Sequence, residues 1–246
     1  MMSLTEKDYP KYLAMAYYAK TGRKLNLRHP KTLNEKIQWL KLYDNLPIKT
    51  QLADKVLVRG WIKEKIGEEY LKPVLWIGDK FDNIPFDKLP DSFIIKCNHG
   101  CKWHVLIKDK NKFLENKFLV KTAKEKIDNW LLQSFFGWSD FETQYKNIEP
   151  KIIIEEFLKG NNGGILVWCA NSQTFIDSPG EELEKEALSL SKVLAQGFKF
   201  VRVDWMIYKQ RLYFEEMTFT PVSGFFPDDV LAKDFYKNLS KNVILK

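Results

Sequence analysis

The spacing of apolar residues changes near residue 73, and this change constrains the fold more than any other feature of the sequence. Before it, apolar residues recur every three or four positions, the period of a helix face. The helices predicted there cover residues 9–20, 32–44 and 50–66. Thr32 and Glu35 form the capping box expected at the start of the second helix. After residue 73 apolar residues form short runs, so the sequence predicts an α+β protein with a helical N-terminal segment, 1–72, and a mixed body, 73–246.

The body divides into two halves, 73–150 and 151–246, and each half contains strands and helices. The predicted strands cover residues 74–77, 93–97, 105–107, 152–158, 165–170, 200–205 and 211–219. The predicted helices cover residues 118–133, 181–194 and 231–239. A tight turn at Lys209 and Gln210 separates the last two strands, so these strands should pair as a hairpin. We therefore expect antiparallel or mixed sheets in the body.

The composition is that of a folded protein with anionic partners. Of the 246 residues, 45% are hydrophobic and 29% are charged, which excludes a disordered chain. The 39 lysines and arginines outnumber the 32 acidic residues, and the net charge of +7 favours nucleotides or acidic glycans as partners. Because the basic residues are spread along the chain, no nucleic-acid partner is expected.

Cysteine number and the length of apolar runs bear on the compartment. The three cysteines are too few, and odd in number, for a disulfide framework, which fits a reducing cytoplasm. Residues 1–10 include acids and no apolar stretch, so we expect no signal peptide. No apolar run approaches the ~20 residues of a spanning helix. The expectation is a cytoplasmic protein without a transmembrane segment, for which membrane contact would be peripheral.

A lysine stands at the end of an apolar run, beside a polar loop. Lys96 is followed after one residue by Asn98-His99-Gly100-Cys101-Lys102. A buried ammonium needs a partner, and the backbone N–H groups of such a loop bind phosphate. The segment is therefore a candidate phosphate site, and a surface lysine before a plain turn is the alternative. A zinc site built from Cys97, His99, Cys101 and His104 has suitable residue types, but four ligands within eight residues leave little scaffold around the ion.

Two predicted strands carry polar residues that alternate with apolar ones. Arg202 and Asp204 share one face of the first strand, and Glu216 and Thr218 share one face of the second. If the strands pair, Asp204 and Glu216 face each other, and they repel unless a cation lies between them. Mg²⁺ accepts such oxygen ligands. The alternative is a solvated polar face with an ion pair to Arg202.

Glu155 and Glu156, two acids within the apolar run 152–158, are further candidate site residues. Together the candidates give a cation with a loop, a strand ending in acids, and a carboxylate pair. A nucleoside triphosphate site needs such parts, for the phosphates, for the base and for the metal.

In this order of parts the chain resembles the ATP-grasp superfamily, and within it the TupA-like (teichuronopeptide-biosynthesis) family of bacterial surface-polysaccharide genes. The segments that carry the resemblance are PKTLNEKIQWLKLYD (30–44), LADK (52–55), KIGEEYL (65–71), FIIKCNHG (93–100), IIIEEFL (152–158), FVRVD (200–204) and EEMTFTPVSGF (215–225).

The resemblance implies an ATP-grasp body and ligase chemistry with ATP and Mg²⁺. It implies that Lys96, with the loop His99, Gly100, Cys101 and Lys102, contacts ATP phosphate. The hinge for adenine and ribose would be Glu155, Glu156, Phe157 and Leu158. The metal ligands would be Asp204 and Glu216, with Thr218 where ATP-grasp enzymes commonly have an asparagine. Arg202 is a candidate catalytic clamp for the transferring phosphoryl charge.

Three departures from the family pattern bear on activity. The loop after Gly100 carries Trp103 where the family is richer in glycine, Leu166 stands where a phosphate-binding lysine is usual, and the stretch before Arg202 is short. The leading expectation is an ATP- and Mg²⁺-dependent carboxylate–amine ligase that joins an amine or amino acid to an acidic glycan or polysaccharide precursor. The alternatives are a phosphoryl or glycosyl transferase acting on such a precursor or a nucleotide-sugar, and a degenerate nucleotide- or glycan-binding module without turnover.

Overall fold

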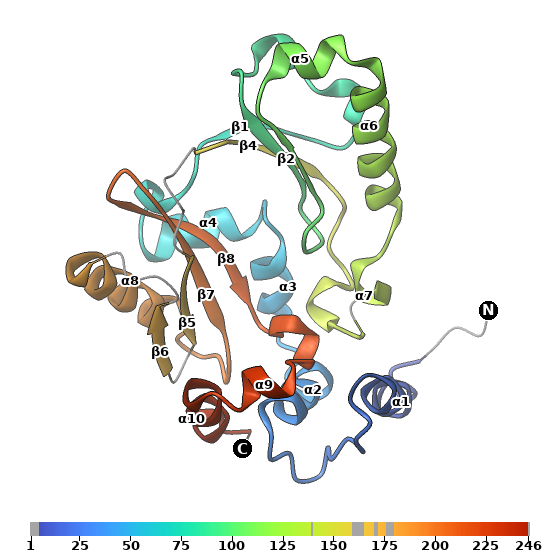
Figure 1. Ribbon diagram of the computed structural model, residues 1–246, viewed down its shortest axis with the longest axis vertical. Coiled ribbons are helices and arrows are strands. Elements are labelled where there is room, and N and C mark those ends of the chain that lie inside the picture. The colour runs from blue at the N-terminus through green and yellow to red at the C-terminus, as the bar shows by residue number, and fades with distance from the viewer. Residues whose placement is uncertain (1–4, 139, 159–164, 170–171, 176–179, 246) are drawn as a thin grey trace.

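The computed structural model describes residues 5–138, 140–158, 165–169, 172–175 and 180–245, and it contains two four-stranded sheets with helices around them (Figure 1). The strands are β1 (Val74–Gly78), β2 (Phe93–Cys97), β3 (His104–Ile107), β4 (Ile152–Glu156), β5 (Ile165–Cys169), β6 (Ser172–Phe175), β7 (Arg202–Tyr208) and β8 (Arg211–Thr218). Sheet A has the order β1-β4-β2-β3, and sheet B has the order β6-β5-β7-β8. The described pairs are all antiparallel, as expected from the short alternating runs.

Helices lie at both ends of the molecule and around sheet B (Figure 1). They are α1 (Tyr9–Thr21), α2 (Leu33–Tyr43), α3 (Pro47–Ala53), α4 (Val58–Lys65), α5 (Lys110–Glu115), α6 (Lys117–Leu132), α7 (Phe135–Trp138), α8 (Glu181–Leu194), α9 (Asp228–Leu231) and α10 (Asp234–Asn242). The capping box is present at α2, where Thr32 accepts from the Glu35 backbone and Glu35 accepts from the Thr32 backbone.

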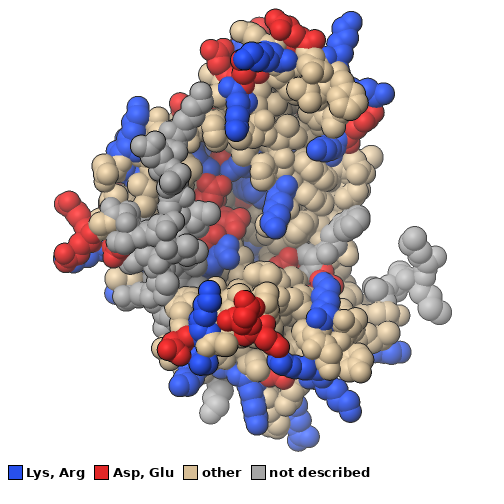
Figure 2. Space-filling view, viewed as in Figure 1, with Lys and Arg blue, Asp and Glu red and all other residues tan. Residues whose placement is uncertain are grey.

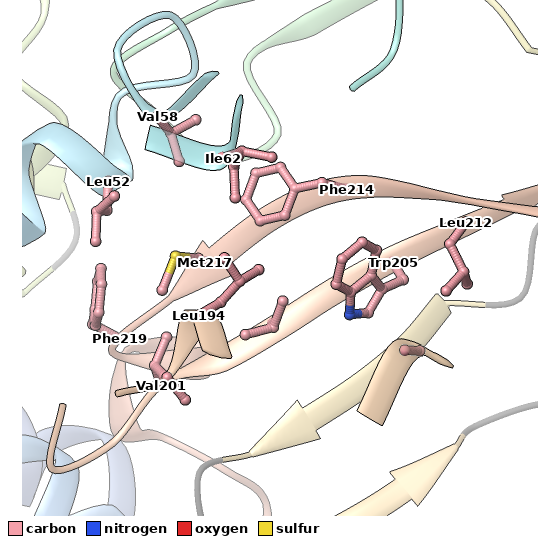
Figure 3. Packing of buried hydrophobic residues seen from close by; sticks show 13 residues of the cluster. Leu52, Val58, Ile62, Leu194, Val201, Trp205, Leu212, Phe214, Met217 and Phe219 are labelled. Carbon is pink, nitrogen blue, oxygen red and sulfur yellow. The ribbon is translucent and has the colours of Figure 1, made fainter. Parts of the chain in front are cut away.

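Sheet B packs one face against α3 and α4, which precede it in the sequence, and against α8, which lies between β6 and β7. Figure 3 shows Leu52, Val58 and Ile62 of the α3–α4 region against side chains of β7 and β8, with Leu194 of α8 beside them. At the centre lies Trp205, which is fully buried and donates from its ring nitrogen to the Ser191 hydroxyl. The opposite face of β7 and β8 is left to polar residues, because side chains alternate along a strand.

Sheet A has its own core, formed with α6 and the 3₁₀ turns after β1. Ala123 and Ile127 of α6 pack against Phe93, Ile95 and Ile154. A third cluster joins α2 to the end of the chain, since Leu33 and Ile37 pack with Leu239 and Val243. The two sheets are thus held by separate apolar clusters, and the space between them remains for polar groups.

Several predicted elements differ from the structure, and the helix predicted over 50–66 differs most. It is two helices, α3 and α4, separated at residues 54–57. Asp54 causes the break, because its side chain accepts from the backbone N–H groups of Val56 and Leu57, at 2.8 and 3.2 Å, and so competes with the helix. The Lys55 N–H in turn bonds the Asn98 carbonyl, at 3.2 Å.

Smaller differences concern short elements. The helix predicted over 231–239 is replaced by α9 and α10, and the strand predicted over 200–205 begins at Arg202 and extends to Tyr208. Strand β6 and helix α5 were not predicted. The hairpin around Lys209 and Gln210 is confirmed, and both turn residues have positive φ, 49° and 59°, as a tight hairpin turn requires.

Candidate functional site

Charged side chains of both signs meet in the hollow between the two halves of the molecule (Figure 2). Sheet A contributes Lys96 and Glu155, and sheet B contributes Arg202, Asp204, Glu215 and Glu216. All six are buried or half-buried, so each depends on its neighbours to offset the loss of hydration. They fall into two clusters, which we call the lysine cluster and the carboxylate cluster.

The lysine cluster is centred on Lys96, which is only 9% exposed. In β2, Lys96 lies opposite Ile153 of β4, and its ammonium nitrogen is 2.8 Å from Glu155 Oε2. A second carboxylate comes from sheet B, where Glu215 Oε1 lies 3.0 Å from the same nitrogen. A surface lysine before a plain turn, the alternative for this position, does not fit this burial.

Three members of the lysine cluster, Lys72, Arg59 and Glu215, were not predicted from the sequence. Lys72 Nζ lies 3.3 Å from Glu155 and also contacts Glu215, and Arg59 is 3.5 Å from Glu155 and donates to the Lys72 carbonyl at 2.7 Å. Glu215 reaches this cluster because of a bulge. The register pairs Asp204 with Glu216 but Trp205 with Phe214, so Glu215 is the extra residue of β8.

The lysine cluster holds its groups in the charged state. Burial alone would raise the pKa of Glu215, but the ammonium groups of Lys96 and Lys72 outweigh burial and lower it to about 2. Likewise burial would lower the pKa of Lys96, but Glu155 and Glu215 raise it above its ordinary value. The same lysines lower the pKa of Glu155 against the effect of burial.

The loop after Lys96 is fixed from several directions. The Asn98 side chain donates to the Glu149 carbonyl and accepts from the Lys151 N–H, at 2.9 and 2.7 Å. Gly100 is required because a Cβ there would lie 2.4 Å from the Trp103 ring. Cys101 and Lys102 are exposed. Both ring nitrogens of His99 are engaged, with Asn98 Oδ1 and the Trp130 carbonyl, at 3.1 and 3.0 Å.

Lys55 is a further cation at this loop that the sequence analysis did not assign. Its ammonium donates to the Gly100 carbonyl at 2.5 Å. Burial lowers the pKa of Lys55, whereas the nearby Glu216 carboxylate acts in the opposite direction. The break between α3 and α4 therefore positions Lys55 between the loop and the carboxylate cluster. The only sequence signal was its presence in the segment LADK.

The carboxylate cluster lies on the polar face of β7 and β8. Asp204 pairs directly with Glu216, and Arg202 with Thr218, on the face that the alternation predicts and in the register that the bulge sets. Arg202 binds Asp204 through two hydrogen bonds, of 2.8 and 2.6 Å, and lies 3.3 Å from Glu216 Oε1. Thr218 donates to that same oxygen at 2.9 Å. The alternative was a solvated polar face with an ion pair to Arg202. The ion pair is present, but Asp204 is only 4% exposed, so the face is not fully solvated.

In the carboxylate cluster two acids share one guanidinium, and the Lys55 ammonium lies near Glu216. Burial raises the pKa of Asp204 to about 7; Glu216 adds to the increase and Arg202 opposes it. A cation would relieve this, and the donors present (two carboxylates and a hydroxyl) are hard oxygen ligands of the kind Mg²⁺ takes. In the described part of the chain no group of three or more His, Cys, Asp and Glu side chains is arranged to hold a metal ion, so the zinc alternative gains no support.

The four predicted hinge residues occupy different environments. Glu155 is committed to the lysine cluster, whereas Glu156 is exposed and its N–H bonds the Pro73 carbonyl at 3.1 Å. Phe157 is half-buried and Leu158 is buried. Leu166, at the position of the expected lysine, lies in β5, and its side chain falls outside the described part of the chain.

One face of α2 holds the segment that follows β8. Asn34, Gln38 and Lys41 recur at helical spacing and are nearly inaccessible to solvent. Asn34 exchanges two hydrogen bonds with the backbone of Phe226, at 3.0 and 2.9 Å. The Gln38 amide donates to the carbonyls of Ser223 and Gly224 at 3.0 and 2.8 Å, and the Lys41 ammonium donates to the Ser223 hydroxyl at 2.6 Å.

The segment held in this way has an unfavourable backbone conformation. Val222 and Ser223 both have φ of 52°, a region that β-branched residues rarely adopt. Gly224 follows with φ of 70°, and a Cβ there would lie 2.6 Å from the Gln38 amide nitrogen. The α2 contacts therefore stabilise a strained turn that begins four residues beyond Thr218.

No helix in the described ranges is long and apolar enough to cross a membrane.

The structure is similar to D-alanine–D-alanine ligase from Helicobacter pylori, with a TM-score of 0.52 and 14% identity over 85% of this chain and 67% of that one. It is also similar to D-alanine–D-alanine ligase from Bacillus anthracis complexed with ATP, with a TM-score of 0.48 and 16% identity over 78% of this chain and 63% of that one. The chain thus spans about two thirds of the length of these ligases.

A comparison with curated proteins found no match. The family model described as TupA-like ATPgrasp matches residues 35–177 and 170–240, which is most of the chain. The two-sheet architecture and the match along the sequence agree, and the chain belongs to the TupA-like ATP-grasp family.

Proposed function

We propose that this protein is an ATP- and Mg²⁺-dependent carboxylate–amine ligase that acts on a precursor of a bacterial surface polysaccharide. The observation that carries the proposal is the carboxylate cluster, in which Asp204 and Glu216 face each other with an excess of negative charge. Lys96 supplies positive charge on the other side of the cleft, and Lys55 supplies it between the loop and the carboxylate cluster. Membership of an ATP-grasp family supports ATP as the anionic partner.

Mg²⁺ in this site would neutralise phosphate charge, and Asp204 and Glu216, assisted by Thr218, would hold it. Lys96 and the backbone of the loop from His99 to Lys102 would bind phosphate oxygens. Phe157 and Leu158, with Glu156 at the strand end, would contact the adenine and ribose. These groups orient the γ-phosphoryl group, which is most of what a protein contributes to phosphoryl transfer.

The chemical reason for ATP is that a carboxylate is a poor acyl donor. A substrate carboxylate oxygen attacks the γ-phosphorus, the bond to the β–γ bridging oxygen breaks, and ADP leaves. The amine nitrogen then attacks the acyl carbon, inorganic phosphate leaves, and the amine proton passes to solvent. Arg202 would stabilise negative charge on the transferring phosphoryl group, because a guanidinium binds such oxygens in pairs.

Calorimetry with ATP, in the presence and absence of Mg²⁺, tests the proposal on wild type and Glu216→Ala. We expect binding that depends on Mg²⁺ and weakens at least about tenfold in the variant. Glu182→Ala, an exposed acid on α8, removes the same charge away from the cleft and should bind as wild type does. Phosphate release with uronic acids and amines would then identify donor and acceptor. Absence of ATP binding to a folded wild type would contradict the proposal.

One observation favours a second candidate, a nucleotide- or glycan-binding module without turnover. Arg202 Nη2 lies 2.6 Å from Asp204 and 3.3 Å from Glu216, so it occupies the position between the carboxylates that a cation would take. Leu166, which stands in place of the expected phosphate-binding lysine, also favours a module without turnover. ATP binding that is independent of Mg²⁺, without phosphate release, would distinguish this module from the ligase. A phosphoryl or glycosyl transfer would instead consume ATP or a nucleotide-sugar without forming an amide.

The proposed partners follow from the reaction: a nucleotide, an acidic glycan or other polysaccharide precursor, and an amine or amino acid. The proposed compartment is the cytoplasm, where ATP is available, with any membrane contact peripheral. Binding to DNA that persists at physiological salt would contradict the expectation that nucleic acid is not a partner.

A further inference from the structure

Glu215 is a charged residue of the cleft to which the proposed reaction gives no role. It comes from sheet B, yet both of its cationic partners, Lys96 and Lys72, lie on the other side of the cleft in or beside sheet A. Glu215 is the extra residue of the bulge in β8, and the bulge directs its side chain toward Lys96 and Lys72. Without the bulge, Glu215 would be an ordinary paired residue of the strand. The contact is therefore a specific product of the local backbone.

The two carboxylates on Lys96 are not equivalent. Glu155 belongs to β4, next to β2 in the same sheet, so its contact with Lys96 persists whatever sheet B does. Its side chain is 7% exposed, whereas that of Glu215 is 31% exposed. Solvent, and therefore a ligand in the cleft, reaches Glu215 but hardly reaches Glu155. Glu215 is the exchangeable partner of Lys96.

Glu215 keeps a second cation as its partner when a phosphate binds Lys96. Its other oxygen contacts Lys72, which Arg59 supports through the Lys72 carbonyl. A carboxylate that loses one of two cations remains compensated, which avoids the cost of a buried unpaired charge. The adjacent residue, Glu216, belongs to the carboxylate cluster, so a phosphate chain that extends from that cluster to Lys96 passes Glu215.

We propose that Glu215 is a positioning residue that occupies the phosphate place on Lys96 in the empty site and is displaced by the nucleotide. It keeps the Lys96 ammonium directed into the cleft, and a phosphate oxygen replaces the Glu215 oxygen when the nucleotide binds. This inference rests on the proposed function. It follows that Glu215 lowers the affinity for phosphates, because each binding event must break one ion pair to form another.

Calorimetry on wild type, Glu215→Gln and the charge-matched control Glu182→Gln tests the inference, with MgATP, adenosine and inorganic tripolyphosphate as probes. We expect Glu215→Gln to bind MgATP and tripolyphosphate about tenfold more tightly than wild type. Adenosine carries no phosphate, so its affinity should be unchanged, whereas a general disturbance of the cleft would alter all three. Phosphate binding by the variant should also fall more steeply with added KCl. Glu182→Gln should behave as wild type.

The outcomes separate the inference from the proposed function. If wild type and Glu215→Gln bind MgATP and tripolyphosphate equally, the inference is overturned and the ligase proposal stands. If tripolyphosphate binds more tightly to the variant but MgATP binds to neither protein, the ligase proposal fails and the exchange at Lys96 stands. If neither probe binds either protein, both fail. Should circular dichroism show that Glu215→Gln is unfolded, Glu215→Ser, which leaves a small polar group at this half-exposed position, takes its place.

Discussion

The lysine cluster and the carboxylate cluster face the same cleft, but they solve the problem of buried charge in opposite ways. In the lysine cluster three cations, Lys96, Lys72 and Arg59, surround two carboxylates, and the pKa of Glu215 is lowered to about 2. In the carboxylate cluster two acids share one guanidinium, and burial raises the pKa of Asp204 to about 7. The first cluster has an excess of cations and keeps its carboxylates charged, whereas in the second the Arg202 guanidinium and the nearby Lys55 ammonium leave the pKa of Asp204 raised.

The difference predicts which side of the cleft depends on a ligand. A compensated cluster contributes to the stability of the empty protein, and removing a member should be costly. An undercompensated cluster is better explained by what it binds than by what it stabilises. The comparison therefore predicts that replacing an acid by its amide changes the free energy of unfolding differently in the lysine cluster and in the carboxylate cluster.

The largest expected effect comes from Glu155→Gln, which leaves three cations of the lysine cluster with one carboxylate. We expect the free energy of unfolding at pH 7 to fall by about 3 kcal/mol, measured by urea denaturation. Glu156→Gln, on the next residue and exposed, should stay within about 0.5 kcal/mol of wild type. A loss below about 1 kcal/mol for Glu155→Gln would show that the lysine cluster is no more stabilising than a surface ion pair.

A second effect, of the opposite kind, is expected for Asp204→Asn. The folded protein binds the Asp204 proton more tightly than the unfolded chain does, so raising the pH from about 4 to about 7 favours unfolding of wild type. The Asp204→Asn variant has no carboxyl at this position, so it lacks this pH-dependent loss of stability. We expect wild type to lose at least about 1 kcal/mol relative to Asp204→Asn between pH 5 and pH 8 in the absence of Mg²⁺. Parallel stability profiles for the two proteins would contradict an undercompensated carboxylate cluster.

Glu215→Gln should show a pH dependence of the reverse sign. Because the pKa of Glu215 is lowered in the folded state, its contribution is fully present above about pH 4.5 and is lost as the pH falls toward 2. We expect wild type to exceed the variant by about 1 kcal/mol at pH 6 and by less at pH 3, in urea titrations. An advantage of wild type that is the same at both pH values would argue against ion pairing as its source.

The smallest effect is expected for Thr218→Val, which removes one hydrogen bond to Glu216 and keeps the branched shape. Stability should fall by about 0.5 kcal/mol, because the hydroxyl is half-exposed. If Thr218 helps to hold the metal, MgATP affinity should fall several-fold, whereas ATP binding in excess EDTA stays unchanged. An equal change under both conditions would assign Thr218 to the strand alone.

The parts of the site that could be predicted from sequence are those that depend on local period. Alternation along each strand was enough to put Asp204 and Glu216 on the polar face, because successive side chains of a strand point to opposite faces. Their direct pairing also needs the bulge at Glu215. The apolar run around Lys96 likewise indicated a candidate buried cation, with a surface lysine as the alternative.

The parts that could not be predicted depend on contacts between distant elements. Lys72 and Arg59 look like ordinary surface cations of a basic helical segment, and only the meeting of two sheets gives them carboxylate partners. Glu215 points where it does because of a bulge that has no local sequence signal. The break at Asp54 was missed because the favourable helix pattern continues on both sides of it. The boundary near residue 72 and the roles of the site residues stay predictions.

The polar face of α2 has a consequence for how this protein can change. Asn34 and Gln38 bind the backbone of residues 223–226 and Lys41 binds the Ser223 hydroxyl, so the turn depends on a helix nearly 200 positions earlier in the chain. A chimera that exchanges the C-terminal half with a relative while keeping this helix would separate two surfaces that fit each other. Recombination and directed evolution should therefore treat α2 and the turn as one heritable unit, and substitutions in one should be rescued by substitutions in the other.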